Sequence, residues 1–146
     1  MSRADSYFAR DPSLHAQGPG RYVDLDGQSP VEFVPGLEFR PVIGDRMLVS
    51  FARYRPHTEA PVHTHEEEQV TFVIDGEFEF DLDGDVRTMR PGMAVHVPPG
   101  VPHGARTGDS ACVEVDVFSP PRSVLVAAVR AASNGEELVA DRPAAG

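Results

Sequence analysis

Hydrophobic and polar residues alternate along most of the chain between Val31 and Phe118, in short runs interrupted by Gly and Pro. Alternation with a period of two is typical of β-strands, because successive side chains of a strand point to opposite faces. The clearest run places Phe78, Phe80 and Leu82 on one face and acidic residues on the other. It predicts a half-exposed strand whose register is fixed by the core. Short strands separated by Gly and Pro turns predict an all-β sandwich or barrel.

The predicted strands follow one another closely. They cover Val31–Val34, Leu37–Val42, Arg46–Tyr54, His63–Ile74, 77–83, Val86–Arg90, Met93–Val97, Val101–Arg106 and Ala111–Phe118. His63–Ile74 is read as one strand, largely apolar on both faces, which indicates burial on both sides. Asp75-Gly76 is the turn signal that follows it.

The two ends of the chain have a different character. Residues 1–30 form an arm rich in Asp, Gly, Pro and Ser, with one strand candidate, Tyr22–Leu25. Tyr7 and Phe8 are candidate anchors of this arm on a surface. After Pro120-Pro121 the period changes, and Val124–Ala132 is predicted to be a helix that begins near Ser123 and is ended by Asn134-Gly135.

This pattern predicts one domain, since 146 residues are typical of a single core. The expected division is an N-terminal arm at 1–30, a β domain at 31–122, and a C-terminal helix and tail at 123–146.

Composition narrows the function classes. The formal net charge is −10 and lysine is absent, which argues against nucleic acid and anionic membranes as partners. Cys112 is the only cysteine, so no disulfide framework exists, and its apolar surroundings predict an inert buried thiol. No stretch approaches the roughly 18 apolar residues of a membrane span, and we expect a cytoplasmic protein.

Two histidines are the first candidate chemistry. His63 and His65 are two residues apart, so on a strand both imidazoles point at one spot, as a metal ion requires. Gln69 follows four residues after His65, and His103 lies downstream after a Pro-x-Gly turn. A pair of satisfied core histidines is the simpler interpretation of His-x-His alone, but the third imidazole and the glutamine favour a metal site.

These stretches resemble the two sequence motifs of the cupin superfamily. The first motif reads H-x-H, then three or four residues, then Glu or Gln, then six residues and Gly. His63, His65, Gln69 and Gly76 fit this motif. The second motif reads G, then five residues, then P-x-G, then two residues and H. Gly92, Pro98, Gly100 and His103 fit this motif. The resemblance implies a cupin jelly roll that holds one divalent metal ion per chain in its cavity. The implied ligands are His63, His65, Gln69 and His103, with zinc as the first choice and nickel, iron or manganese as alternatives.

Gln69 departs from many cupins, which carry Glu at this position. With a neutral amide in place of a carboxylate, the net charge of the metal site is one unit more positive, which favours a stronger Lewis acid. It also leaves open whether Gln69 or His96 supplies the fourth ligand. Glu67 shares the parity of His63 and His65 if the strand is unbroken, and would then reach the cavity as a base. His57 is interpreted as a loop residue.

The last strand carries a second candidate group. Cys112, Glu114, Asp116 and Phe118 share one face of Ala111–Phe118. That face is either a solvent-facing edge or a pocket wall. The run D-x-F-x-P-x-R, which holds Asp116, Phe118 and Arg122, is similar to a motif of small cupins that open unsaturated uronates. The resemblance implies that Asp116 is the acid/base, Phe118 a cavity wall and Arg122 a clamp for a carboxylate or enolate.

The chemistry that this implies is proton transfer next to a carbonyl held by a metal. Our first expectation is a cupin-type polyketide cyclase, which performs enolisation and aldol ring closure on an aromatic polyketide intermediate. The extra arm and helix and the apolar candidates Phe78, Phe80 and Phe118 favour this substrate over a sugar. An isomerase that opens unsaturated uronates and a cupin dioxygenase are the enzyme alternatives, and a non-catalytic ligand sensor is the fourth. We also expect a homodimer, because Phe72 and Ile74 face away from the metal and need a cover.

Overall fold

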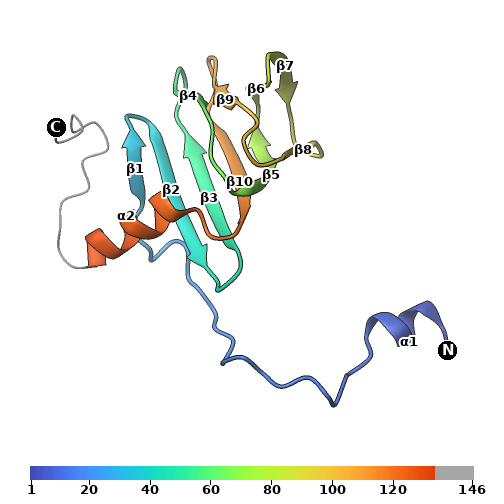
Figure 1. The fold of residues 1–146 in the computed structure, drawn as a ribbon. Coiled ribbons are helices and arrows are strands. Elements are labelled where there is room, and N and C mark those ends of the chain that lie inside the picture. The colour runs from blue at the N-terminus through green and yellow to red at the C-terminus, as the bar shows by residue number, and fades with distance from the viewer. Residues whose placement is uncertain (134–146) are drawn as a thin grey trace.

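The computed structural model describes residues 1–133 as two helices and ten strands (Figure 1). The helices are α1 (Arg3–Tyr7) and α2 (Ser123–Ser133). The strands are β1 (Val31–Val34), β2 (Leu37–Ile43), β3 (Leu48–Tyr54), β4 (Glu59–His63), β5 (Glu68–Gly76), β6 (Phe78–Leu82), β7 (Asp85–Met89), β8 (Ala94–Val97), β9 (His103–Arg106) and β10 (Cys112–Ser119).

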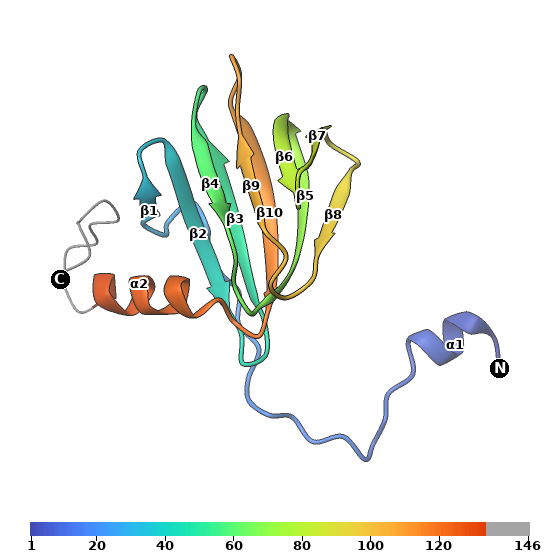
Figure 2. The same ribbon diagram turned by 45° about the horizontal axis from the view of Figure 1, so that its top comes forward.

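The strands form two antiparallel sheets that face each other (Figure 2). The larger sheet has the order β1-β2-β3-β10-β5-β8, and the smaller has the order β4-β9-β6-β7. The all-β prediction with a C-terminal helix is therefore confirmed. β10 lies inside the larger sheet between β3 and β5, so its polar face is not a solvent-facing edge.

The prediction of one strand from His63 to Ile74 is wrong. β4 ends at His63 and pairs with β9 in the smaller sheet, whereas β5 begins at Glu68 and pairs with β10 and β8 in the larger one. The residues between them carry the chain from one sheet to the other. The metal motif therefore spans a sheet-to-sheet connection, and a parity argument does not extend across it.

The Asp75-Gly76 signal marks a second crossing of this kind and not a hairpin turn. β5 runs through Gly76, and after Glu77 the chain enters β6 in the smaller sheet. Gly76 has a φ of 75°, which L side chains rarely adopt. A Cβ here would also lie 2.1 Å from the Ala111 carbonyl oxygen. The motif glycine is thus required by both the backbone conformation and the close approach of a neighbouring chain segment.

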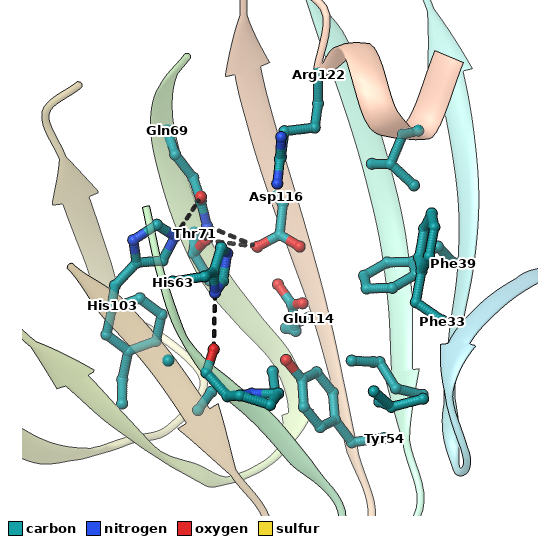
Figure 3. Close-up of a pocket in the computed structure, with 18 of the residues that line it drawn as sticks. Phe33, Phe39, Tyr54, His63, Gln69, Thr71, His103, Glu114, Asp116 and Arg122 are labelled. Carbon is teal, nitrogen blue, oxygen red and sulfur yellow. Dashed lines mark hydrogen bonds between the residues drawn. The ribbon is translucent and has the colours of Figure 1, made fainter. Parts of the chain in front are cut away.

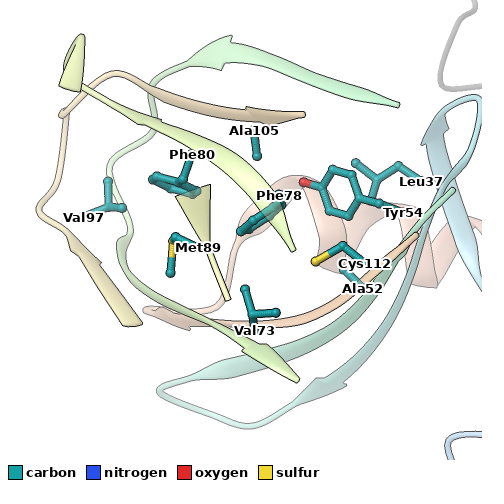
Figure 4. Packing of buried hydrophobic residues seen from close by; sticks show 10 residues of the cluster. All are labelled: Leu37, Ala52, Tyr54, Val73, Phe78, Phe80, Met89, Val97, Ala105 and Cys112. Carbon is teal, nitrogen blue, oxygen red and sulfur yellow. The ribbon is translucent and has the colours of Figure 1, made fainter. Parts of the chain in front are cut away.

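The core lies between the sheets. Phe78, Phe80 and Met89 from the smaller sheet pack with Val73 and Tyr54 from the larger one (Figure 4). The second hydrophobic cluster lies under α2 and joins Leu125 of the helix to Leu48 and Phe118 of the sheet. This cluster holds the helix across the open end of the sandwich beside β1 and β2 (Figure 2).

The helix α2 begins at Ser123, as predicted. The expected stop at Asn134-Gly135 and the tail to Gly146 lie outside the described residues.

Two expectations for surfaces are corrected. The outward face of β5 is not buried within one chain, since Val70 and Ile74 are 37% and 52% exposed and Phe72 is half-buried. The arm has no strand at Tyr22–Leu25, and the exposed Tyr7 and Phe8 do not anchor it, because the arm extends away from the sheets (Figure 1).

Among residues 1–133, neither helix has the length and apolar character needed to cross a bilayer.

We predict that Gly76→Ala destabilises the fold by several kcal/mol, since it adds a steric clash to the ~1–2 kcal/mol cost of the left-handed backbone. Gly84→Ala is the matched control, because Gly84 has a φ of 88° and no atom within 4 Å of the added Cβ. Urea unfolding of both variants measures the difference. Equal free energies of unfolding would show that the Ala111 contact relaxes at no cost.

Candidate metal centre and pocket

Three imidazoles converge where the two sheets are joined. His63 ends β4, His103 begins β9, and the two are opposite each other in the antiparallel register. His65 reaches the same point from the connection that leads to β5. One ring nitrogen from each of the three residues lies within 4.8 Å of the others. Within residues 1–133 the structure thus brings together the three histidines that the sequence predicts.

The remaining nitrogen of each ring is held by the backbone. The Nδ1 atoms of His63, His65 and His103 lie 2.8, 3.0 and 2.9 Å from the carbonyl oxygens of Pro61, Glu67 and Val101. A carbonyl only accepts hydrogen bonds, so each Nδ1 carries the proton and each Nε2 presents a lone pair. Hydrogen bonds of this kind orient metal-binding imidazoles.

Burial favours the neutral form of two of these imidazoles, His103 and His65. It lowers the pKa of His103 to about 4, with further lowering from the neighbouring His63 and His65. The pKa of His65 is lowered by burial and by the positive charge of Arg122. Neutral imidazole is the form that binds a metal, because its lone pair is free.

Gln69 completes the cluster with its amide oxygen. Its Nε2 donates to Thr71 Oγ1 at 2.7 Å and to Asp116 Oδ1 at 3.3 Å. This turns its Oε1 toward the Nε2 atoms of His65 and His103, at 3.0 and 3.1 Å. Those two nitrogens lie 3.2 Å apart.

The cluster therefore contains converging acceptors with no donor between them. Two imidazole lone pairs and one amide oxygen repel one another unless a cation lies among them. Nitrogen and oxygen ligands of this kind suit first-row divalent metals. The residues thus fit a metal ion, and the geometry supports Gln69 as the proposed fourth ligand.

The other histidines lie elsewhere. His96 is opposite Val70 on the outward face of β8, and its Nε2 is 2.7 Å from Glu68 Oε2. It faces outward because Val97, its neighbour, fills the core, so His96 is not the alternative fourth ligand. His57 is an exposed turn residue beside Asp109, as expected.

Glu67 is buried, but it lies behind the cluster. Its Oε2 accepts a hydrogen bond from the Ser123 amide at 3.1 Å. Its Oε1 lies 3.6 Å from His65 Nδ1 and 3.6 Å from Arg122 Nη1. Because the strand is broken before it, Glu67 contacts the back of His65 instead of reaching the cavity, and this favours a positioning role.

A cavity of about 350 Å³ opens beside the cluster. His63, Gln69 and His103 lie at one end of it, and Phe33 and Phe39 lie at the other (Figure 3). All five of the other predicted site residues also line it: Phe78, Phe80, Asp116, Phe118 and Arg122. The cavity therefore joins a polar, metal-binding end to an apolar, aromatic end.

Asp116 is a cavity-lining carboxylate that Gln69 links to the cluster. It is 7% exposed, and Thr71 Oγ1 donates to its Oδ1 at 2.5 Å. Burial raises the pKa of Asp116, and hydrogen bonding with Glu114 and then with Thr71 opposes that shift. Thr71 and Gln69 donate to Oδ1, Glu114 is a further hydrogen-bond partner of the carboxyl group, and Asp116 lines the cavity.

Several lining residues were missed by the sequence analysis. Glu114 shares a strand face with Asp116 and could have been found from that alternation. Thr71 lies two residues after Gln69, on the same face of the strand, and could have been found from the same alternation. Phe33 and Phe39 come from β1 and β2, and no local pattern indicated that these strands border the pocket.

Sequence comparisons identify the domain type. The family model described as Cupin domain matches residues 50–118. H2HPP isomerase of Bacillus subtilis is 32% identical over 83 residues, which are 55% of this chain and 34% of that protein. The chain thus matches about a third of the length of this curated relative.

Solved structures share the fold. An RmlC-like cupin from Shewanella frigidimarina has a TM-score of 0.68 at 25% identity, over 75% of this chain and 99% of that chain. KdgF from Halomonas sp. has a TM-score of 0.69 at 24% identity, over 73% and 99%. The polyketide cyclase RemF from Streptomyces resistomycificus has a TM-score of 0.63 at 24% identity, over 69% and 80%. The cupin fold implied by the sequence motifs is confirmed.

We predict that the purified protein holds about one equivalent of a divalent metal, with zinc the first expectation. His63→Ala and His103→Ala should lose it, because each removes an Nε2 ligand. His96→Ala is the matched control and should retain it. Metal content is measured by elemental mass spectrometry after dialysis, and full occupancy in both cluster variants would contradict the site.

Proposed function

The chain has the cupin fold and its residues 50–118 match the family model described as Cupin domain, and on this premise we propose that the protein is a metal-dependent polyketide cyclase that acts on an aromatic polyketide intermediate. The observation that supports the proposal is the single cavity that joins the imidazole cluster, Asp116 and Arg122 to aromatic walls. A fused aromatic chain fits such a lining better than a sugar does, because most of its contacts would be apolar. The relatives include enzymes, among them a cyclase and an isomerase by name.

Each residue has a defined task in this proposal. The metal, held by His63, His65, His103 and Gln69, would supply Lewis-acid polarisation of a substrate carbonyl. The carboxyl group of Asp116 moves a proton at the carbon next to that carbonyl.

The remaining site residues act on charge and water. Arg122 lies at the cavity wall with its side chain 20% exposed, and its positive charge steadies the developing enolate. Phe78, Phe80 and Phe118 exclude water from the enolate, so that it closes a ring onto a second carbonyl.

A second function has a specific observation in its favour. The D-x-F-x-P-x-R run places Asp116, Phe118 and Arg122 on the same cavity wall, as an isomerase that opens unsaturated uronates would require. A dioxygenase would use the same imidazole cluster with a redox-active metal. A purely ligand-sensing role is less well supported, because Asp116 and Arg122 both line the cavity. A cytoplasmic location stays a prediction.

We predict that Asp116→Asn retains the metal and the fold but loses about 10²–10⁴-fold in turnover, as expected when a positioned proton-transfer group is removed. Arg122→Leu should weaken substrate binding and rate together. Asp85→Asn, an exposed surface change, is the control. The assay follows ring closure of a polyketide intermediate in a reconstituted pathway, with unsaturated galacturonate as the competing substrate.

The outcomes separate the candidates. Wild-type turnover of the polyketide by metal-loaded Asp116→Asn would make Asp116 structural. Turnover of the uronate alone would replace the cyclase proposal with the isomerase.

We also predict that the protein is a homodimer that pairs through the outward face of β5, where Val70 and Ile74 are exposed. Ile74→Glu should produce monomers, because a charge in that interface would lose its hydration. Val86→Glu is the control, since Val86 is equally exposed at 51% but lies on β7 of the smaller sheet. Sedimentation equilibrium measures both, and a wild-type monomer at micromolar concentration would contradict the dimer.

A further inference from the structure

Thr71 is a buried hydroxyl to which the proposed chemistry gives no role. It is 0% exposed and lies on β5, directly opposite Asp116 of β10 in the antiparallel register. Gln69 is two residues before it on the same strand, so both side chains point to the same face of the sheet. The Thr71 hydroxyl therefore lies between the proposed fourth metal ligand and the carboxyl group that is proposed to move the proton.

These three side chains form a closed triangle of hydrogen bonds (Figure 3). Gln69 Nε2 donates to Thr71 Oγ1 at 2.7 Å and to Asp116 Oδ1 at 3.3 Å. Thr71 Oγ1 donates to Asp116 Oδ1 at 2.5 Å. An amide nitrogen carries two hydrogens and a hydroxyl carries one, so the three contacts have three hydrogens. The triangle uses the whole amide nitrogen of Gln69, and this leaves the amide oxygen to face the imidazoles.

A glutamate at position 69 would break this count. An ionised carboxylate has no hydrogen to donate, so the Thr71 hydroxyl would hold the only hydrogen available for the three contacts. One carboxylate oxygen would also take the place of Nε2, which lies 3.3 Å from Asp116 Oδ1. Two negative groups that close repel each other strongly in a buried site. The triangle thus gives a physical reason for the amide at a position where many cupins carry Glu.

The strand on the other side of β10 offers no equivalent contact. Ser50 lies opposite Asp116 on β3 and is also 0% exposed, but its Oγ has no hydrogen-bond partner within residues 1–133. Two buried hydroxyls therefore flank the same carboxyl group, and only that of Thr71 is bonded to it. Ser50 is for this reason a natural control for Thr71.

We propose that Thr71 is a positioning residue whose hydroxyl aligns the Gln69 amide with the metal and the Asp116 carboxyl group with the cavity, and that this triangle requires glutamine at position 69. The inference rests on the proposed role of Gln69 as a metal ligand, but not on ring closure or any other reaction. It is therefore tested by metal affinity and by unfolding, and not by turnover.

Zinc affinity tests the alignment of Gln69. Thr71→Val keeps the shape of the side chain and removes the hydroxyl, and we expect the Kd for zinc to rise about tenfold, as is typical when a residue that orients a metal ligand is lost. Thr71→Ser restores the hydroxyl and should restore the affinity. Ser50→Ala is the matched control and should bind zinc as the wild type does. Competition with a chromogenic chelator measures the four Kd values.

A double-mutant cycle tests the requirement for glutamine. Gln69→Glu is introduced into the wild type and into Asp116→Asn, both saturated with zinc, and urea unfolding is measured. An asparagine at position 116 returns two amide hydrogens to the triangle. Gln69→Glu should therefore favour the folded state about tenfold more in Asp116→Asn than in the wild type. The change of zinc ligand is common to both backgrounds and cancels. Asp85→Asn, an exposed change, is the control background and should show no coupling.

Each test can overturn its part of the proposal. Equal zinc affinity in the wild type and Thr71→Val, or an equal loss in Thr71→Val and Thr71→Ser, would show that the hydroxyl does not align Gln69. A coupling within about twofold of additivity would show that Asp116 does not require the amide. If Thr71→Val does not fold, the cycle alone decides, and neither readout changes if the cyclase proposal fails.

Discussion

The hydrogen bonds from three imidazole Nδ1 atoms to backbone carbonyls are the constraint on which the site depends. They fix the rings of His63, His65 and His103 and leave three Nε2 lone pairs aimed at one another. Because the carbonyls belong to residues two positions away from each ring, the site is built from local backbone geometry. The fold needs only to bring β4 and β9 into register, which places His63 opposite His103.

The central strand β10 extends this constraint across the pocket. It is paired on both sides, with β3 and β5, so its inward side chains cannot reach the outer surface. Asp116 is tied to the cluster through Gln69 and Thr71. Hydrogen bonds thus connect Gln69, the proposed fourth metal ligand, to the carboxyl group of Asp116 at the cavity wall.

The sequence predicted the sheets, the helix and the imidazole cluster because these features depend on local periodicity and on two motifs of fixed spacing. It did not predict the break between His63 and Glu68. The run of β-forming residues continues in composition while the backbone changes sheet, and only the pairing partners reveal the break. The side of the strand on which His96 lies was ambiguous from the sequence for another reason, since Val95 and Val97 are both apolar and only the structure shows that Val97 occupies the core. The apolar end of the pocket depends on contacts between β1, β2 and α2, which no local pattern encodes.

The pocket wall also shows where stability and binding are in conflict. An apolar residue at position 114 would pack against Ala52 and Val73 without an unpartnered oxygen, and would be expected to stabilise the isolated chain. Burial instead raises the pKa of both carboxyl groups; the negative charge of Asp116 raises that of Glu114 further, whereas hydrogen bonds with Glu114 and Thr71 oppose the shift at Asp116. A neutral Glu114 that donates to an ionised Asp116 satisfies one carboxyl with the other, so that the pair carries a single negative charge at the cavity wall. The fold therefore keeps a buried acid pair on β10, at the wall of the proposed ligand cavity, where an apolar residue would be more stable.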